Sequence, residues 1–307
     1  MVLLKGERWC IGLILAVLAW VFVVQAITGV PIVWGGFAAG IGLFGIIAGF
    51  GLLLRLRGHS VNISSMLVVI GLFPIFASVL SVATMLAFPL QRPLIDDLLF
   101  SIDAALGYHW DAAVILLAEY PRFAAVLGKI YLSSFPQLLI LAIFLGLTRR
   151  AMQMYHLLLT GMIAAIMTLA FWLIWPSFGP SAYLSLAPEV LEATGLVVTP
   201  QYGAVLMHFA EVGVPKIESH LVLGSVAFPS YHIVMALMVV WFARGTVLFW
   251  PALAVNLLMI PATLTHGGHH LIDLPGGLVG FALATVLAGR LLQDDPVLVA
   301  PAARASV

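Results

Sequence analysis

The chain has 307 residues, of which 63% are hydrophobic and only 8% are Asp, Glu, Lys or Arg. Soluble domains carry about 25% charged residues, so this composition indicates an integral membrane protein. The formal net charge is zero, which gives no electrostatic reason to expect a nucleic-acid partner. The single cysteine, Cys10, excludes an internal disulfide and argues against a cysteine metal cluster.

Apolar segments that can cross a bilayer follow one another along the chain. They lie near residues 10–30, 33–54, 66–89, 123–147, 153–175, 229–243, 246–264 and 272–292. The first follows Lys5 and Arg8 and exceeds the apolar part of a secretory signal, so we expect an uncleaved signal anchor. The sixth is short because we place a tight turn at Arg244 and Gly245. The sequence therefore predicts an all-α integral membrane protein with about eight transmembrane helices.

The charged residues predict how the chain is oriented. Eight spans place both termini on one side, and most basic residues fall on that side: Lys5, Arg8, Arg55, Arg57, Arg149, Arg150, Arg244, Arg290 and Arg304. Four fall on or near the other side: Arg92, Arg122, Lys129 and Lys216. Most acidic residues show the opposite bias. This is the pattern of a protein with cytoplasmic termini, and we expect a multi-pass protein of a bacterial inner membrane.

Two segments on the predicted outer side are too long to be simple connections. Residues 92–121 carry an apolar stripe at helical spacing, formed by Leu94, Leu98, Ile102, Ala105 and Leu106. Asp96, Asp97 and Asp103 fall off that stripe, which predicts a helix lying in the membrane interface with Asp96 and Asp97 on a solvated face. Residues 177–228 begin with a stretch rich in proline and glycine. We expect the two segments together to roof an outer pocket.

The second span is rich in glycine. Gly36, Gly40, Gly45 and Gly49 form two pairs of small residues four positions apart. This spacing predicts close packing of the span against a neighbouring helix.

Three polar motifs fall on the predicted outer face. They are "QRP" at residues 91–93, "FPSYH" at residues 228–232 and "THGGHHLIDLPGG" at residues 265–277. The last two precede spans, and the start of a helix offers unpaired backbone N–H groups that suit an anion. Ser230 lies at such a start, where its hydroxyl can cap the helix or bind a phosphate oxygen. The motifs predict a polar site at the outer boundary of the membrane.

His269 and Asp273 are four residues apart, so they share a face if the helix begins early enough. A carboxylate bonded to one ring nitrogen fixes the histidine tautomer and leaves the other nitrogen free to attack an electrophile. His232 follows Ser230 by two residues and would face the same cavity. His266 and His270 keep no assigned role beyond structural or interfacial contacts.

Pro-Ser-Tyr-His at residues 229–232, followed by the His-x-x-x-Asp pattern of residues 269–273, resembles the type 2 phosphatidic acid phosphatase superfamily. The chain resembles more closely the branch that contains inositol phosphorylceramide synthases and sphingomyelin synthases, in which an Arg-Pro pair precedes the interfacial segment, as Arg92 and Pro93 do here. The resemblance covers residues 91–280. It implies a catalytic helical bundle over residues 65–293, preceded by a two-helix membrane extension at 1–64 and followed by a cytoplasmic tail at 294–307.

The resemblance implies catalysis through a phosphohistidine, with no metal and no cofactor. His269 would be the nucleophile, Asp273 would orient it, and His232 would protonate the leaving oxygen. Ser230 and Arg92 would hold phosphate oxygens; an alternative for Arg92 is an anchor at the membrane interface. The partners implied are the lipid bilayer, a membrane lipid substrate and an alcohol or water acceptor.

Two departures from the superfamily pattern bear on the reaction. Met85 and Thr263 stand where the wider superfamily has a lysine and an arginine, a difference shared with the sphingolipid-synthase branch. They favour a phosphotransferase that moves a phosphorylated head group. The alternative is a plain phosphatase acting on phosphatidic acid or polyprenyl phosphate. The motifs identify neither the lipid donor nor the acceptor.

Two other classes of function compete with phosphoryl transfer. A metal-dependent membrane hydrolase would use His266, His269, His270 and Asp273 as ligands, a spacing that suits a divalent ion. A transporter would show internal symmetry or charges at the bilayer midplane, whereas the charges here lie at the ends of the spans. Phosphoryl transfer explains the second and third motifs together better than either.

Overall fold

Apolar helices dominate the structure, as the composition predicts. The computed structural model describes residues 3–221, 224 and 226–293, and helices account for 76% of the structure. No strand occurs among these residues; a single bridge joins Ile32 to Ile217. The all-α membrane fold is therefore confirmed, while the predicted tail at 294–307 lies outside the described residues.

Six helices are long and apolar enough to cross a membrane. They are α1 (Lys5–Thr28), α2 (Trp34–Leu56), α3 (Val61–Met85), α8 (Ala151–Ile174), α12 (Phe249–His266) and α13 (Asp273–Leu292). A seventh crossing forms if α6 (Pro121–Leu132) and α7 (Ser134–Leu147), which meet at a bend of 52°, count as one span. α11 (Tyr231–Ala243) is about 20 Å long, shorter than the roughly 30 Å hydrocarbon layer. The total of eight therefore stays a prediction.

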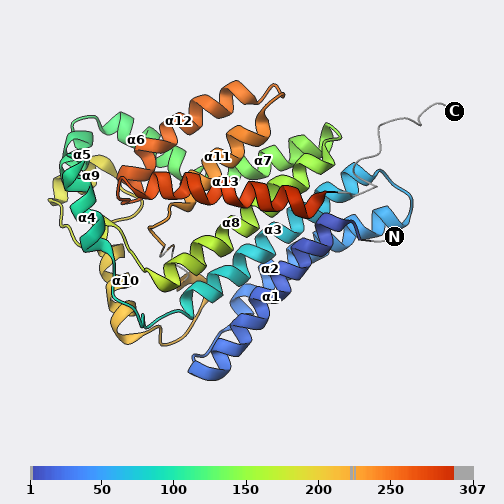
Figure 1. Cartoon of the computed structure of the whole chain (residues 1–307), viewed down its shortest axis with the longest axis horizontal. Coiled ribbons are helices and arrows are strands. Elements are labelled where there is room, and N and C mark those ends of the chain that lie inside the picture. The colour runs from blue at the N-terminus through green and yellow to red at the C-terminus, as the bar shows by residue number, and fades with distance from the viewer. Residues whose placement is uncertain (1–2, 222–223, 225, 294–307) are drawn as a thin grey trace.

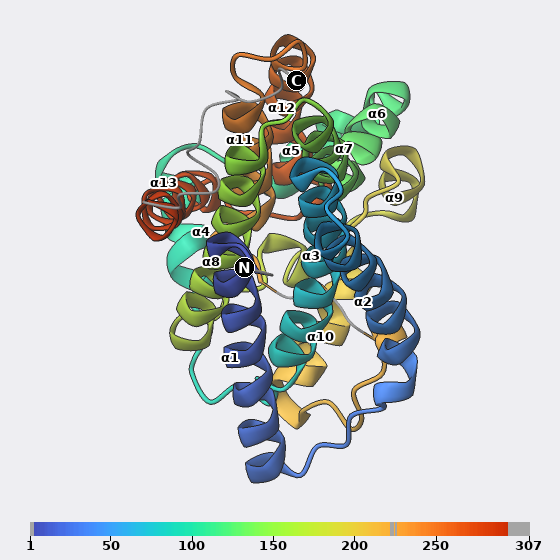
Figure 2. The same cartoon turned by 90° about the vertical axis from the view of Figure 1, so that its right-hand side faces the viewer.

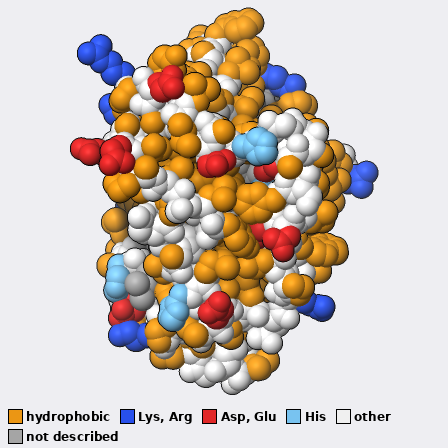
Figure 3. Space-filling view, turned by 90° about the vertical axis from the view of Figure 1, so that its left-hand side faces the viewer, with side chains coloured by type: hydrophobic (Ala, Val, Ile, Leu, Met, Phe, Trp, Pro, Cys, Tyr) orange, Lys and Arg blue, Asp and Glu red, His pale blue; other side chains and the backbone are white. Residues whose placement is uncertain are grey.

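The remaining helices are short and gather at one end of the bundle (Figure 1). They are α4 (Asp96–Ala105), α5 (Trp110–Ala118), α9 (Pro188–Thr194) and α10 (Pro200–Val212), with 3-10 turns η1 (Pro180–Ala182) and η2 (Ser219–Leu221). The N-terminus lies at the other end (Figure 1). Figure 3 views the end with the short helices, where acidic side chains and histidines lie among hydrophobic ones and most basic side chains lie at the margins.

The basic residues predicted to lie on the cytoplasmic side occur at or near the ends of helices. They lie at the start of α1, the end of α2, the α7–α8 connection, the end of α11 and the last turn of α13: Lys5, Arg8, Arg55, Arg57, Arg149, Arg150, Arg244 and Arg290. Arg304 lies outside the described residues. Which of the two ends faces the cytoplasm stays a prediction.

The structure corrects the interpretation of residues 92–121. The segment forms two helices, α4 and α5, rather than one. Leu98 and Leu106 of the apolar stripe are exposed and Asp97 is exposed as predicted, but Asp96 and Asp103 are buried, with exposed fractions of 0% and 3%. The prediction of a solvated face was wrong for Asp96, because buried hydrogen-bond donors replace the water that this carboxylate loses.

The glycines of α2 do not pack as the sequence predicts. A Cβ atom added at Gly40, Gly45 or Gly49 would meet nothing within 4 Å, and of the four predicted glycines only Gly36 lies close to a neighbour, Ser219. The close α2–α3 contact instead involves Gly51 of α2 and Gly71 of α3, where a Cβ atom would lie 2.7 Å from the Ser64 carbonyl oxygen and 2.5 Å from the Phe44 carbonyl oxygen, respectively. Figure 2 shows α1, α2 and α3 running along one flank of the bundle.

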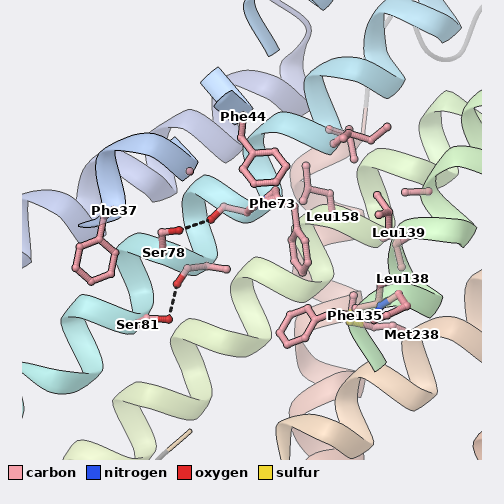
Figure 4. A pocket seen from close by; sticks show the side chains of 18 of the residues that line it. Phe37, Phe44, Phe73, Ser78, Ser81, Phe135, Leu138, Leu139, Leu158 and Met238 are labelled. Atoms are coloured by element: carbon pink, nitrogen blue, oxygen red, sulfur yellow. Dashed lines mark hydrogen bonds between the residues drawn. The ribbon is translucent and has the colours of Figure 1, made fainter. Parts of the chain in front are cut away.

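A large apolar cavity lies between α2, α3, α7 and α8 (Figure 4). Its volume is about 740 Å³, and Met238 of α11 and Ser219 complete its lining. Ser78 and Ser81 donate their hydroxyl hydrogens to carbonyl oxygens one turn earlier in α3, so the lining stays apolar. α8 is the most buried of the spanning helices, and its Tyr155 and Trp172 side chains are completely buried in the bundle.

A buried ion pair fixes α1 and α2 to α8 at the end that holds the N-terminus. Glu7 accepts hydrogen bonds of 2.6 and 2.7 Å from the Arg55 guanidinium and one of 2.5 Å from the Tyr155 hydroxyl. The Glu7 carboxylate is fully buried, and Arg55 also contacts Ser64 and Ser65 of α3. One carboxylate therefore connects four helices.

We expect Glu7→Gln to destabilise the protein, because it leaves the Arg55 guanidinium buried without its anion. Loss of one partner of a buried ion pair costs about 3 kcal/mol, which corresponds to a fall of several degrees in melting temperature. Thermal unfolding of the detergent-solubilised protein measures this. The control is Glu218→Gln, which removes the partner of Lys216 in a largely exposed pair and should change nothing measurable. Equal shifts in both variants would contradict the role of Glu7.

Candidate active site

The connection between α12 and α13 carries the two residues predicted to act as nucleophile and orienter. Nδ1 of His269 lies 2.8 Å from Oδ2 of Asp273, and both side chains are almost completely buried. Gly268 makes the reversal of the chain possible: its φ is +61°, and a Cβ atom there would lie 2.4 Å from the Ser181 hydroxyl. The tight turn thus places His269 shortly before the start of α13.

The start of α11 brings Ser230 and His232 to the same place. The Ser230 backbone N–H donates to the Asp273 carbonyl, and the Ser230 hydroxyl lies 3.5 Å from Nε2 of His269. This hydroxyl makes no capping hydrogen bond to α11, so it faces the histidine instead. The His232 ring lies 6.5 Å from the His269 ring, measured between centroids. Ser230, His232, His269 and Asp273 are therefore neighbours, as predicted.

Tyr131 of α6 holds the His232 ring in a fixed orientation. The two rings stack with centroids 4.0 Å apart and an interplanar angle of 18°. Tyr131 is buried and also lies beside Gly267, where a Cβ atom would be 2.8 Å from its ring. No residue pattern in α6 identifies this contact, because it joins segments a hundred residues apart.

Asp273 fixes the tautomer of His269. Its Oδ2 accepts a hydrogen bond of 3.0 Å from the His270 backbone N–H in addition to the contact with His269 Nδ1. An acceptor at Nδ1 places the ring proton there, so the lone pair of a neutral imidazole is on Nε2, facing Ser230. The geometry is that of a histidine whose free nitrogen is available to react.

His270 connects the loop to α4, a contact that sequence reasoning missed. Nδ1 of His270 lies 2.7 Å from Asp103 and Nε2 lies 3.4 Å from Asp96, with all three side chains buried. Asp103 also accepts a hydrogen bond of 2.9 Å from the Leu271 backbone N–H. The signal was present in the sequence: Asp96 and Asp103 are seven residues apart, two turns along one face of a helix.

Asp96 also organises the segment that follows α8. Its carboxylate accepts hydrogen bonds from the backbone N–H groups of Phe178 and Gly179 and from the hydroxyl groups of Ser177 and Tyr183, at 2.8 to 3.2 Å. These donors replace the hydration that a buried carboxylate loses. Asp96 thus contacts both the proline- and glycine-rich stretch and the His270 ring.

The electrostatics of His270 follow from its three acidic neighbours. Burial by itself lowers the pKa of His270, but the contact with Asp96 and the charges of Asp273 and Asp103 outweigh burial and raise that pKa. Protonation of His270 is therefore more favourable in the folded protein than in the unfolded chain.

The remaining predicted site residue, Arg92, is not part of this cluster. It is exposed in the connection between α3 and α4, and no hydrogen bond, ion pair or ring contact among the described residues joins it to the other four. Its phosphate-binding role stays a prediction. Met85 and Thr263, which replace basic residues of the superfamily pattern, are both buried, and the Thr263 hydroxyl has no partner in the described part of the chain.

The four residues of the alternative metal site do not converge on a common point. His269 faces Asp273, the His270 ring faces Asp96 and Asp103, and His266 packs against Gly128. Within residues 3–221, 224 and 226–293, no group of three or more His, Cys, Asp or Glu side chains is arranged to hold a metal ion.

Comparison with known families gives one match. The model of a family described as the PAP2 superfamily matches residues 97–288, from α4 to the last turns of α13. The match includes Ser230, His232, His269 and Asp273 but not Arg92, and it leaves α1, α2 and α3 outside. The predicted domain boundary at residues 64 and 65 is untested by it. No curated protein and no solved structure matches the chain.

The His270 contacts should stabilise the protein in a defined pH range. The folded-state pKa lies above the unfolded value of about 6.5, so the stabilisation is complete below that pH and is lost as pH rises through the folded-state pKa. We expect the difference in melting temperature between wild type and His270→Gln to be largest near pH 6 and to shrink in alkaline buffer. His59→Gln, at an exposed position, is the control. A pH-independent difference would contradict the assignment.

Proposed function

The chain belongs to the PAP2 superfamily, and from this premise we propose that it is a membrane lipid phosphotransferase that works through a phosphohistidine. Membership of this superfamily supports a lipid phosphatase or phosphotransferase type of activity. The finer proposal rests on one observation, the buried His269–Asp273 pair whose free Nε2 faces Ser230. We place the site at the non-cytoplasmic face, the end opposite the basic helix termini.

In the proposed first step, Nε2 of His269 attacks the phosphorus of a lipid phosphate ester. A nitrogen–phosphorus bond forms as the bond to the leaving oxygen breaks. Asp273 stays bonded to Nδ1 and stabilises the positive charge that develops on the ring. His232, on the far side of Ser230, donates a proton to the leaving oxygen. Its stacking on Tyr131 keeps the ring in place for that transfer.

In the second step an acceptor oxygen attacks the phosphohistidine. His232 now takes the acceptor's proton, and the bond from phosphorus to His269 breaks. Water as the acceptor gives hydrolysis, which is phosphatase activity when the donor is a phosphomonoester, and an alcohol gives a transferase. The two activities share the first step and the same four residues, so the acceptor alone distinguishes them.

The proposed phosphate site relies on donors other than Lys and Arg. The first backbone N–H groups of α11 have no partner within the helix, and the Ser230 hydroxyl lies beside them. In the described part of the chain, no Lys or Arg side chain contacts Ser230, His232, His269 or Asp273. A phosphodiester carries one negative charge, whereas a phosphomonoester can carry two. A site without Lys or Arg suits the diester better, which supports transfer of a phosphorylated head group.

We expect His269→Ala to lower turnover of the lipid substrate at least about a thousandfold, because it removes the nucleophile. Purified protein in mixed micelles, offered phosphodiester and phosphomonoester lipids labelled with ³²P, measures this. Wild type should also retain acid-labile, base-stable label on the chain, and His269→Ala should not.

The matched control is His109→Ala, at an exposed histidine outside the cluster, which should leave turnover unchanged. Asp273→Asn should lower the rate of turnover more than it lowers lipid binding, since the wrong tautomer weakens the nucleophile. Full activity of His269→Ala on the same lipid would overturn the mechanism. Higher turnover of monoester than of diester, with phosphate as the product, would favour the phosphatase.

A further inference from the structure

The large apolar cavity between α2, α3, α7 and α8 takes no part in the catalytic steps proposed above. None of Ser230, His232, His269 and Asp273 is among its lining residues. Its walls join two parts of the chain, because α2 and α3 lie outside the family match whereas α7, α8 and α11 lie inside it. The helices that precede the matched region therefore supply one side of a space whose other side belongs to the family bundle.

The lining offers an apolar environment. No Asp, Glu, Lys, Arg or His side chain lines the cavity among the residues that the structure describes. The hydroxyl groups of Ser78 and Ser81 donate within α3, at 2.9 and 2.8 Å from the carbonyl oxygens of Pro74 and Ala77. An ordered water needs about two to four polar partners, so this cavity suits an apolar molecule better than water.

The exposed lining residues show where the cavity opens. Gly40 of α2 and both Phe135 and Leu139 of α7 are exposed, whereas Leu158 of α8 and Met238 of α11 are buried (Figure 4). The opening therefore lies between α2 and α7, which both pack against α3, and α8 and α11 form the floor. Because α2 is long and apolar enough to cross the membrane, the opening faces lipid chains.

The cavity has the length of a lipid chain. On α3 its lining extends from Val69 to Ser81, about 18 Å at the helical rise per residue. The hydrocarbon layer of a bilayer is roughly 30 Å thick, and each leaflet contributes about half of it. A single hydrocarbon chain in one leaflet therefore matches the long dimension of the cavity.

One end of the cavity lies beside charged side chains. Gly36, in the first turn of α2, lies against Ser219, whose hydroxyl would be 2.6 Å from a Cβ atom added at Gly36. Lys216 and Glu218 are close to Ser219 in the chain, and Nζ of Lys216 lies 2.7 Å from Oε1 of Glu218. A phospholipid head group carries a phosphate and in zwitterionic lipids an ammonium group as well. This pair of opposite charges complements such a head group.

We propose that the cavity binds one hydrocarbon chain of a phospholipid from the surrounding bilayer, with the lipid head group beside Ser219. The free-energy cost of an unfilled apolar cavity grows with its volume, and at about 740 Å³ it would exceed the net stability of a typical domain. A chain that enters between α2 and α7 removes this cost and supplies the van der Waals contacts that the lining side chains lack. The proposal goes beyond the phosphotransferase function and does not depend on it.

Photolabelling of the full-length protein in phosphatidylcholine nanodiscs tests this binding. A small fraction of the phosphatidylcholine carries a diazirine at the end of one acyl chain, and mass spectrometry locates the adducts after irradiation. We expect label on Ile70 and Phe73, partly exposed residues of α3 that line the cavity. Ile46 of α2 is exposed, does not line the cavity and lies at a similar depth, since Phe44 lies against Gly71. Label on Ile46 without label on Ile70 and Phe73 would overturn the proposal.

Gly40→Phe should exclude the chain from the cavity. A Cβ atom at Gly40 would meet nothing within 4 Å, so the ring can enter the space without moving the backbone. We expect label on Ile70 and Phe73, relative to Ile46, to fall about tenfold or more, because the ring displaces several CH₂ groups of the chain. The matched control is Gly45→Phe, since Gly45 has equally open surroundings on α2 but does not line the cavity. Its labelling should equal that of wild type.

Ala77→Phe adds a ring from α3, a second wall of the cavity, and should lower the same labelling independently of Gly40→Phe. Unchanged labelling of Ile70 and Phe73 in both variants would overturn the assignment of the cavity. An equal fall in Gly40→Phe and Gly45→Phe would also overturn it, because the effect would then not depend on filling the space.

Turnover separates this proposal from the proposed function. Labelling in the His269→Ala protein should equal that of wild type, because the cavity and the reacting groups share no residue. Gly40→Phe should keep the turnover of wild type for the same reason. Parallel loss of label and turnover in Gly40→Phe would overturn the assignment to a bilayer lipid and assign the cavity to the substrate chain. Full turnover in His269→Ala with normal labelling would overturn the phosphohistidine mechanism and leave the lipid site intact.

Discussion

A carboxylate enclosed by helices loses its hydration, and Oδ2 of Asp273 replaces part of that hydration with hydrogen bonds from the His269 ring and the His270 backbone. The rest of the site follows from this requirement. The ring of His269 must turn Nδ1 toward Asp273, which leaves Nε2 directed at Ser230. The backbone of His270 must approach the same carboxylate oxygen, which fixes the turn before α13. One buried charge therefore decides the tautomer of a histidine and the path of the loop that carries it.

The buried carboxylates of α4 also need hydrogen-bond donors, and His270 connects them to the loop. Asp96 and Asp103 are buried because His270, a backbone amide of the loop and the donors of residues 177–183 surround them. The loop, α4 and the segment after α8 thus form one hydrogen-bonded unit, in which the contact with Asp96 and the charges of Asp273 and Asp103 raise the pKa of His270 against the effect of burial. Lys and Arg side chains make no contact with the four residues of the candidate site in the described part of the chain.

At the opposite end of the bundle, the buried Glu7 carboxylate also replaces lost hydration with hydrogen bonds, here from different partners. Arg55 and Tyr155 surround it, so the helices outside the family match are tied to α8 by a buried ion pair. Among them, α2 and α3 also form one side of the large apolar cavity (Figure 4). Polar connections thus hold the two ends of the bundle, and apolar side chains line the space between them, as the cost of burying an unpaired charge in hydrocarbon requires.

The sequence by itself determined the membrane class and the positions of the long helices, and it predicted a site formed by Ser230, His232, His269 and Asp273. Hydrophobic length and short motif spacings are local properties, so they can be read along the chain. The tertiary structure alone decided that Asp96 and Asp103 point inward, that Arg92 lies outside the cluster and that Tyr131 stacks on His232. Each of these depends on partners distant in sequence. For a buried polar group, the available hydrogen-bond partner, and not the local pattern, determines which way the side chain turns.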